Sequence, residues 1–320
     1  MRFLVTGAAG FIGSHLCDAL LSKGDSIVGL DDLSTGNKEN LSSALKHENF
    51  KLVEGNILQK ELVSRLVEDS DYVLHFAAAV GVQKILNDTL GSLRTNIEGS
   101  ENVLLSATES GKPLILASTS EIYGKNSDAL TEESDRILGS PLKVRWTYSE
   151  AKALEESVAK SLSVNNGLQV KIARLFNTVG PRQSAAYGMV IPRFFTAALR
   201  NESLTVHGDG DQQRIFCHVS DSVSAILGLI ESPEGNGEAF NIGGFEEISI
   251  SELAKKIVAL TNSSSRIVYV PYEELEKSGF EDMPRRRPVT SKIQRVTNWK
   301  PTKGIDYILK DYFSWLKNEF

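Results

Sequence analysis

The sequence predicts an α/β protein in which a doubly wound parallel sheet is followed by a smaller C-terminal α/β substrate lobe. Three observations predict this fold class. The chain opens on an apolar strand that runs into three closely spaced glycines. Short apolar segments then alternate with segments of helical periodicity. Polar side chains also gather where strands are expected to end, which is the edge at which such sheets bind ligands. Together these features are typical of a Rossmann-type dinucleotide-binding sheet.

The first strand and the first helix form the glycine turn. Residues 2–6 are apolar and β-rich, residues 11–23 have helical periodicity, and Gly24 suits the end of that helix. Between them Gly7, Gly10 and Gly13 have the spacing G-x-x-G-x-x-G. Glycines alone would fit an ordinary turn, but in the order strand, loop and helix they let backbone approach a pyrophosphate at the helix N-terminus.

An acidic pair follows the second strand. Residues 25–30 read as this strand, and Asp31 and Asp32 come directly after it. By itself such a pair could simply start a turn. After a glycine turn, a carboxylate at this place accepts the hydroxyls of the adenosine ribose and repels a 2'-phosphate, so NAD is favoured over NADP.

The rest of the first half continues the alternation of strands and helices. Strands are expected at 50–53, 72–76 and 113–117, with helices at 61–67 and 90–106. The strand at 72–76 runs into Ala77, Ala78 and Ala79, whose small side chains would let a cofactor lie close. We expect these strand ends to line the same ligand site.

A hydroxyl-rich segment and a tyrosine-lysine pair carry the candidate chemistry. Thr119, Ser120 and Glu121 follow the strand at 113–117, and a helix expected from Tyr148 to Ser161 puts Tyr148 and Lys152 on one face. A phenol is a poor base at neutral pH, but a nearby ammonium and a positive nicotinamide both favour the phenolate. Tyr148 is therefore the expected general base, with its pKa lowered by Lys152.

The second half is expected to build the substrate lobe. Helices are predicted at 190–201, 221–231, 249–260 and 305–318, and strands at 204–207, 214–218 and before residues 241–244. We expect residues 1–176 to form the NAD-binding domain and 177–320 the substrate lobe, with about 220–260 returning to the first domain. The basic run at 285–287 could be a solvated face, but it is also well placed to bind a diphosphate.

Composition sets limits on partners and compartment. The chain has 320 residues, is 41% hydrophobic and carries a net charge of -6. That charge argues against nucleic acid or an anionic membrane as the main partner. Cys17 and Cys217 are too few for a disulfide framework and read as buried apolar residues. Without an apolar run near 20 residues or a signal segment before the first strand, a cytoplasmic location is expected.

At this point the residues resemble a known family, the extended short-chain dehydrogenase/reductases that modify nucleotide sugars, also called the NAD-dependent epimerase/dehydratase family. The resemblance spans nearly the whole chain and is specific because the motifs occur in order. They are TGAAGFIG at 6–13, Asp31, HFAA at 75–78, TN at 95–96, STSEIYG at 118–124, YSEAK at 148–152, RLFNTVGPR at 174–182, GDGDQQRIF at 208–216 and RRRP at 285–288.

The resemblance implies roles for individual residues. Thr119, Tyr148 and Lys152 would be catalytic, with Ser120 and Glu121 beside them. NAD would be held by Tyr148, Lys152 and a set from the glycine turn and strand ends: Gly7, Gly10, Phe11, Ile12, Gly13, Asp31, Asp32, Asn56, Ile57, Ala77, Ala78 and Asn96. Many members carry Asp where this chain has Asn56. The substrate, a nucleotide sugar and most simply a UDP-sugar, would contact Asn177, Arg182, Arg214 and Arg286. No metal site is expected.

The resemblance also implies a reaction that begins with transient oxidation at sugar C4, after which three fates compete. The Thr-Ser-Glu run at 119–121 resembles UDP-glucuronate decarboxylases, which form UDP-xylose or a UDP-4-keto-pentose. It also resembles GDP-mannose 4,6-dehydratases, but these generally prefer NADP, which Asp31 argues against. The pair Arg145-Trp146 resembles the bacterial decarboxylase of lipid A modification and the UDP-apiose/UDP-xylose synthases, although it would also fit a core Trp beside a solvated Arg. The segment at 182–194 resembles 4-epimerases instead, and 4,6-dehydration of the sugar is the third fate. A non-catalytic NAD-binding sensor is a different class, but such relatives typically lose Tyr148 and Lys152.

Two further expectations follow from the family. Arg286 would bind the substrate diphosphate, or else the carboxylate of a glucuronate by a bidentate pair. Family members usually dimerise through the helices that correspond to 90–106 and 148–161. A homodimer is therefore expected by analogy.

Overall fold

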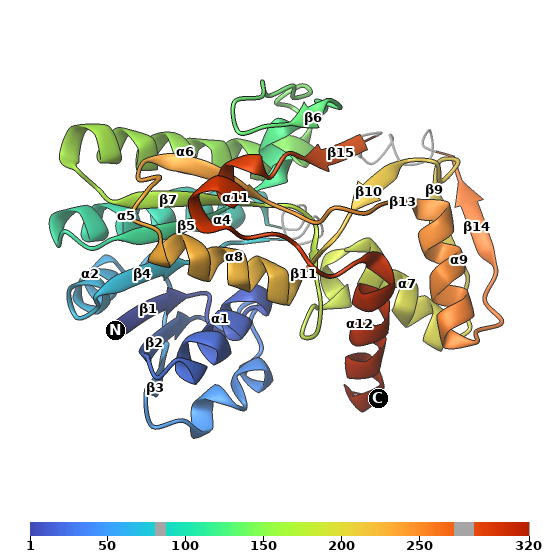
Figure 1. Cartoon of the computed structure of the whole chain (residues 1–320), viewed down its shortest axis with the longest axis horizontal. Coiled ribbons are helices and arrows are strands. Elements are labelled where there is room, and N and C mark those ends of the chain that lie inside the picture. The colour runs from blue at the N-terminus through green and yellow to red at the C-terminus, as the bar shows by residue number, and fades with distance from the viewer. Residues whose placement is uncertain (81–87, 272–284, 320) are drawn as a thin grey trace.

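The computed structural model describes residues 1–80, 88–271 and 285–319. At its centre lies a seven-stranded sheet in the order β3-β2-β1-β4-β5-β7-β12, in which every neighbouring pair is parallel (Figure 1). This is the strand order of a doubly wound sheet and confirms the predicted fold class. The strands are β1 (Arg2–Thr6), β2 (Ser26–Asp31), β3 (Phe50–Glu54), β4 (Tyr72–His75), β5 (Leu114–Thr119), β7 (Val170–Leu175) and β12 (Glu238–Ile242).

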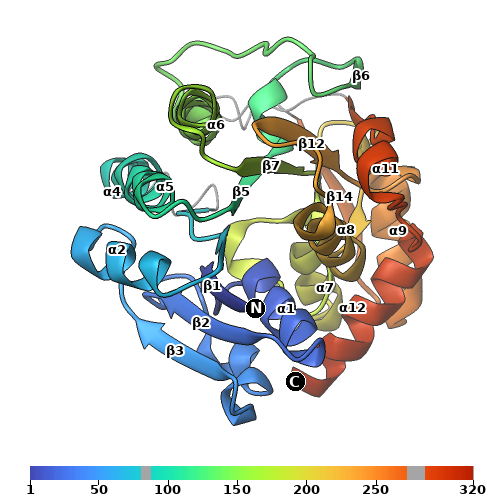
Figure 2. The same cartoon turned by 60° about the vertical axis from the view of Figure 1, so that its left-hand side comes forward.

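Helices cover both faces of this sheet (Figure 2). One face carries α1 (Phe11–Ser22), α8 (Val219–Glu231) and α11 (Ser291–Thr297), and the other α2 (Lys60–Glu68), α4 (Thr89–Arg94), α5 (Ser100–Glu109) and α6 (Thr147–Asn166). Covered on both sides, the central strands β1, β4 and β5 are mostly buried, as parallel strands require, whereas the edge strand β3 is partly exposed. Among the helices of the described residues, none is both long and apolar enough to span a membrane.

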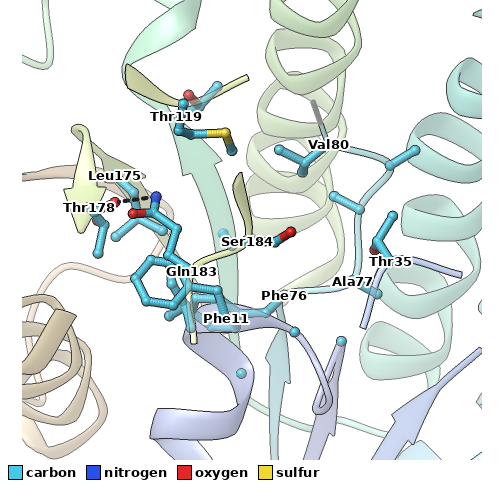
Figure 3. Close-up of a pocket in the computed structure, with 18 of the residues that line it drawn as sticks. Phe11, Thr35, Phe76, Ala77, Val80, Thr119, Leu175, Thr178, Gln183 and Ser184 are labelled. Atoms are coloured by element: carbon cyan, nitrogen blue, oxygen red, sulfur yellow. Dashed lines mark hydrogen bonds between the residues drawn. The ribbon is translucent and has the colours of Figure 1, made fainter. Parts of the chain in front are cut away.

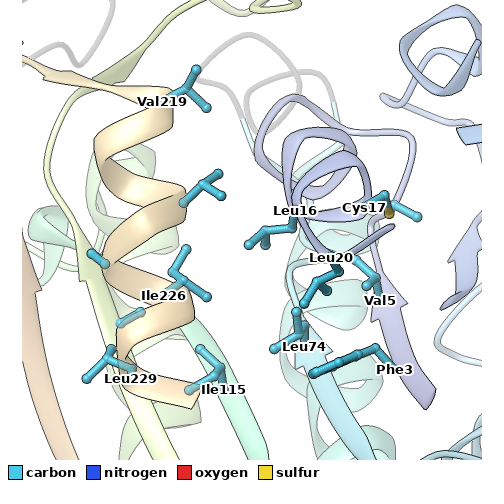
Figure 4. Packing of buried hydrophobic residues seen from close by; sticks show 14 of the residues in the cluster. Phe3, Val5, Leu16, Cys17, Leu20, Leu74, Ile115, Val219, Ile226 and Leu229 are labelled. Carbon is cyan, nitrogen blue, oxygen red and sulfur yellow. The ribbon is translucent and has the colours of Figure 1, made fainter. Parts of the chain in front are cut away.

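The largest core lies between the sheet and the pair α1 and α8. Leu16 and Leu20 from α1 face Ile226 and Leu229 from α8 across the sheet residues (Figure 4). Complete burial of such side chains stabilises the fold by about 2 kcal/mol each. Cys17 and Cys217 are both free and buried, the latter near α8, so they act as the apolar residues that the sequence predicts.

The smaller lobe has its own core. Helices α7 (Val190–Leu199), α9 (Ile250–Thr261) and α12 (Ile305–Glu319) pack together beside the strands β9 (Leu204–His207) and β14 (Ile267–Val270) (Figure 1). A four-stranded sheet lies nearer the cavity, in the order β13 (Glu247–Ser249), β10 (Gln213–Ile215), β15 (Arg285–Pro288) and β6 (Ala129–Leu130). A third pair joins β11 (Cys217–His218) to β8 (Thr178–Val179).

The chain returns to the large sheet through α8 and β12, which pairs with β7. Helix α9 does not follow them, because it packs against α7 in the core of the smaller lobe. The returning stretch is therefore shorter than the expected residues 220–260. The start of α9 is fixed by Ser249, whose hydroxyl accepts from the Glu252 backbone N–H while the Glu252 side chain caps Ser249 in return.

The helix expected over residues 90–106 is interrupted. The chain forms α4, then a π-helical turn over Thr95–Gly99, and then α5. In that turn the Asn96 side chain accepts from the Ala79 N–H at 2.7 Å and donates to the Ala79 carbonyl at 3.1 Å. A wider turn of this kind often occurs where a side chain must serve a site. Here it fixes the small-residue loop that follows β4.

The strand expected over residues 214–218 is also divided. Residues 213–215 form β10, which pairs with β13 and β15, whereas 217–218 form β11, which pairs with β8. The basic run at 285–287 belongs to a strand, β15, in which Arg286 pairs in register with Arg214 of β10. The cations are thus held by sheet hydrogen bonds rather than by a free loop.

Candidate active site

A cavity of about 1040 Å³ lies at the carboxyl ends of β1, β2, β4 and β5, between the large sheet and the smaller lobe. Figure 3 shows Thr119, Phe11, Ala77 and Gln183 around it. The expected site residues that line it are Gly7, Gly10, Phe11, Ile12, Gly13, Asp31, Asp32, Asn56, Ile57, Ala77, Ala78, Thr119, Ser120, Glu121, Tyr148, Lys152, Asn177, Arg182 and Arg286. The predicted strand ends therefore do meet at one place.

Two expected residues lie outside the cavity wall. Asn96 is buried behind it and holds Ala79, so its contact with the site is indirect. The Arg214 guanidinium donates to the Gln213 carbonyl at 2.8 Å, and Arg214 pairs in register with Arg286, which lines the cavity. Direct contact of Asn96 with NAD and of Arg214 with the substrate stays a prediction.

The glycine turn is packed too tightly for side chains. Gly7 has φ +72°, and a Cβ there would lie 2.7 Å from the backbone of residues 76 and 77. A Cβ on Gly13 would lie 2.0 Å from the Gly7 carbonyl oxygen. Helix α1 consequently starts directly against β1, and its N-cap, Gly10, has no side chain to occupy the free N–H groups. These groups face the cavity and can bind an anion.

The acidic position is held by the same turn. Asp31 is buried, and its carboxylate accepts from the Ala9 N–H at 2.8 Å and the Leu33 N–H at 2.9 Å. Asp32 is exposed and accepts from the Asn56 amide at 2.6 Å. The carboxylate of Asp31 therefore has a fixed position at the edge of the cavity, whereas Asp32 and Asn56 form the outer rim of the cavity.

Tyr148 and Lys152 reach the cavity from the start of α6. The Ser149 hydroxyl donates to the Glu121 carbonyl at 2.9 Å, which ties this helix to the turn after β5. Lys152 is buried, and its ammonium donates to the Ala117 carbonyl at 3.1 Å and to the Glu155 carboxylate at 2.8 Å. The pair thus lies beside Thr119, the last residue of β5, as the spacing predicts.

The electrostatics of Tyr148 differ from the expectation. Burial raises the pKa of Tyr148 well above its usual range, and the carboxylates of Glu155 and Glu121 raise it further. Lys152 was expected to lower this pKa, but its ammonium is balanced by Glu155. In the protein alone, Tyr148 is therefore a neutral phenol.

Two guanidiniums meet one carboxylate at the other end of the cavity. Glu121 accepts from Arg286 at 2.7 Å and from Arg145 at 2.6 Å. Arg286 also contacts the Ser120 hydroxyl at 3.3 Å, and the Arg145 guanidinium lies over the ring of buried Trp146 at 5.2 Å. Burial would raise the pKa of Glu121, but the two guanidiniums outweigh it and lower this pKa to about 2. Two guanidiniums and one carboxylate thus lie together in the wall of the cavity.

The Glu121 ion pairs should make stability depend on pH. Because folding lowers the pKa of Glu121 from 4.5 to about 2, its contribution is present above pH 4.5 and is lost as pH falls towards 2. We expect Glu121→Gln to lower the free energy of unfolding by about 2 kcal/mol at pH 6. Urea unfolding at several pH values should show this difference from the wild type shrinking below pH 4.5. A difference that stays constant down to pH 3 would contradict the assignment.

Sequence reasoning missed several parts of this site. Gln183 lines the cavity and donates to the Thr178 carbonyl at 3.0 Å (Figure 3). Arg182 has φ +68° and pairs with Asp18 of α1 at 2.6 Å, which places it on the α1 side of the cavity. These contacts join segments far apart in the chain, and no local pattern marks them. Glu155 could have been noticed, because an acidic residue one turn after a buried lysine faces the same way.

Comparison with known proteins adds to this geometry. Residues 3–243 match the family described as NAD dependent epimerase/dehydratase family. A UDP-N-acetyl-alpha-D-glucosaminuronate decarboxylase from Bacillus cytotoxicus is 39% identical over 99% of this chain and 98% of its own length. A UDP-glucuronic acid decarboxylase 1 from Danio rerio is 34% identical over 98% of this chain and 72% of its own length.

Solved structures are similar over the same extent. A UDP-glucuronic acid 4-epimerase from Bacillus cereus, crystallised with UDP-glucuronic acid and NAD, has a TM-score of 0.90 and 28% identity, and all of both chains is covered. A UDP-glucose 4-epimerase from Thermotoga maritima, crystallised with UDP-glucose, has a TM-score of 0.88 and 29% identity over 100% of this chain and 99% of its own. The fold of this chain thus recurs in both of these epimerases.

Proposed function

This chain belongs to the NAD dependent epimerase/dehydratase family, and from that premise we propose that it decarboxylates a UDP-linked hexuronate, most simply UDP-glucuronate. The observation that carries the proposal is the cluster of Arg145, Arg286 and Glu121, which brings two guanidiniums to the wall of the cavity. A guanidinium can bind the carboxylate of a hexuronate through a bidentate pair. A neutral hexose offers no such group.

The cofactor of the family is NAD, and the residues present fit it. The α1 N-terminus, free of side chains at Gly7, Gly10 and Gly13, suits the pyrophosphate. The fixed carboxylate of Asp31 suits the hydroxyls of the adenosine ribose and disfavours a 2'-phosphate. When bound, NAD supplies a hydride acceptor and a positive ring near Tyr148.

The chain's own groups divide the work at the sugar. Tyr148 takes the proton of the C4 hydroxyl, and Thr119 hydrogen-bonds the same oxygen and so orients it. Arg286 pairs with Glu121, which lies two residues after Thr119 in the chain. Arg286 would bind the C6 carboxylate. A ketone at C4 turns that carboxylate into part of a β-keto acid, which loses carbon dioxide readily. The positions of these residues therefore suit decarboxylation after oxidation at C4.

A second candidate is 4-epimerisation of the same sugar. It is supported by the likeness to the Bacillus cereus 4-epimerase, which was crystallised with UDP-glucuronic acid, a sugar nucleotide that carries the same carboxylate. Binding of the anion therefore does not decide between the two fates. A 4,6-dehydratase would act on a neutral hexose, which suits the charged cluster less well. A sensor without activity is disfavoured, because Thr119, Tyr148 and Lys152 all line the cavity.

The test is to incubate the protein with NAD and UDP-glucuronate and to follow products by NMR together with carbon dioxide release. We expect carbon dioxide and a UDP-pentose or UDP-4-keto-pentose. An axial C4 hydroxyl with all six sugar carbons retained would select epimerisation. UDP-N-acetylglucosaminuronate, UDP-glucose and dTDP-glucose are tested in parallel, and a 6-deoxy-4-keto product would select dehydration.

We also propose that the protein is a homodimer that pairs through α4, α5 and α6, which lie together on one side of the sheet (Figure 2). This face exposes Leu90 of α4 and Leu154 and Val164 of α6, apolar side chains that a second copy would cover. We expect light scattering to give the mass of two chains for the wild type. Leu154→Glu should shift the equilibrium towards the monomer. A monomeric wild type at micromolar concentration would contradict the proposal.

A further inference from the structure

Glu155 is a buried carboxylate directly behind the candidate catalytic pair. It lies on α6 one turn after Lys152 and accepts from its ammonium at 2.8 Å. The side chains of Lys152 and Glu155 are only 3% and 2% exposed, and Glu155 does not line the cavity. Substrate and cofactor would therefore not touch Glu155, whereas Lys152 faces both.

A line of hydrogen bonds leads from β1 to Ser100 of α5. Thr6 Oγ1 lies 2.7 Å from His75 Nδ1, and His75 Nε2 lies 2.9 Å from the Ser100 hydroxyl. The Ser100 hydroxyl lowers the pKa of Glu155. Among the described residues, Glu155 Oε1 has no hydrogen-bond partner, whereas Oε2 accepts from Lys152.

The Lys152 ammonium opposes the effect of burial on the pKa of Glu155. Burial raises the pKa of Glu155, and Lys152 and Ser100 oppose that rise. His75 stays neutral, because burial and then Lys152 lower its pKa to about 3. The carboxylate therefore balances the ammonium of Lys152 from the side opposite to the cavity.

We propose that Glu155 is a positioning residue that holds Lys152 against β5 and offsets its charge, and that it thereby controls the ionisation of Tyr148. The inference rests on the proposed function only in taking Tyr148 as the base. With the Glu155 charge present, Tyr148 becomes a phenolate mainly when the positive nicotinamide ring is bound. The base would then be active only in the enzyme that holds its cofactor.

The charges around Tyr148 can be separated experimentally. From α6 it faces Lys152 and Glu155, and from the turn after β5 it faces Glu121, which is paired with two arginines. The next carboxylate along α6, Glu156, is paired with Arg174 of β7 at 2.7 Å. Replacing Glu155 by Gln therefore removes one negative charge beside Lys152 and leaves these other pairs in place.

The experiment is an ultraviolet titration of tyrosinate in the protein saturated with NAD, with the Tyr148 signal isolated by subtracting the Tyr148→Phe variant. We expect Glu155→Gln to lower the midpoint for Tyr148 by about one pH unit, because Lys152 is then no longer balanced. The rising limb of the pH profile of kcat should move in the same direction. Glu150→Gln, which removes an exposed carboxylate from the same helix, should leave both unchanged.

A second variant, Ser100→Ala, tests the same role if Glu155→Gln fails to fold. Ser100→Ala keeps the carboxylate but removes a donor that favours its ionised form, so it should move the Tyr148 midpoint in the same direction by a smaller amount. If neither variant moves the Tyr148 midpoint from its wild-type value, the role of Glu155 is overturned, while Tyr148 remains the base. A Tyr148 signal absent from every protein at accessible pH would overturn both.

Discussion

Replacement of Tyr148 by Phe is expected to lower kcat on UDP-glucuronate by about 10³-fold while NAD stays bound. The phenylalanine keeps the ring that packs at the start of α6 but has no oxygen to take the proton of the C4 hydroxyl. Lys152 keeps its contacts with Ala117 and Glu155, so the site should retain its shape. The loss should therefore lie in kcat rather than in KM or in stability.

The measurement is initial-rate kinetics with the bound NAD quantified after release from the protein. Tyr269→Phe is the matched control, because it makes the same chemical change on β14, where the hydroxyl contacts Ser251 far from the cavity wall. We expect that variant to keep kcat within about twofold. Activity of Tyr148→Phe near the wild-type level would remove the base from the mechanism.

Replacement of Arg286 by Gln is the second large effect, with kcat/KM on UDP-glucuronate expected to fall by about 100-fold. Arg286 is 7% exposed at its side chain and contacts both Glu121 and Ser120, so it lies in the cavity wall beside the turn that follows Thr119. Without it the hexuronate carboxylate would lack the guanidinium that is proposed to bind it.

Inhibition by UDP separates the two roles considered for Arg286. If this residue binds the carboxylate, the inhibition constant of UDP should change by no more than about twofold in Arg286→Gln. If the binding of UDP weakens as much as the binding of the substrate, Arg286 is assigned to the diphosphate instead. Arg285→Gln is the control, because Arg285 is exposed and pairs with Glu247 on the outer side of β15. It should behave like the wild type.

Local patterns were sufficient for the framework of the site. The glycine turn, Asp31 and the pair Tyr148 and Lys152 each depend on residues close in sequence, and their spacing fixes which way they face. The sheet order follows from the alternation of strands and helices. These features are therefore where the expected and observed structures agree, including the first strand, whose ends are identical.

What could not be predicted depends on contacts between distant segments. Strand 214–218 looks continuous by hydrophobicity, but its two halves pair with different partners, β15 and β8. The pairing of Glu121 with both Arg145 and Arg286 joins three separate parts of the chain. The effect of Lys152 on the pKa of Tyr148 differs from the expectation for a similar reason. The expectation considered the Lys152 ammonium without the carboxylate of its neighbour Glu155.

The π-helical turn at Thr95–Gly99 has a consequence for how this part of the chain can vary. In a regular helix each residue adds about 100° of rotation, so a single extra residue reorients everything after it. Asn96, which secures Ala79, lies within that turn, and Ser100, which contacts His75 at the end of β4, follows directly after it. A perfectly regular helix would change the direction of one of these two side chains. The π-helical turn therefore lets one helical segment hold both the end of β4 and the loop that follows it.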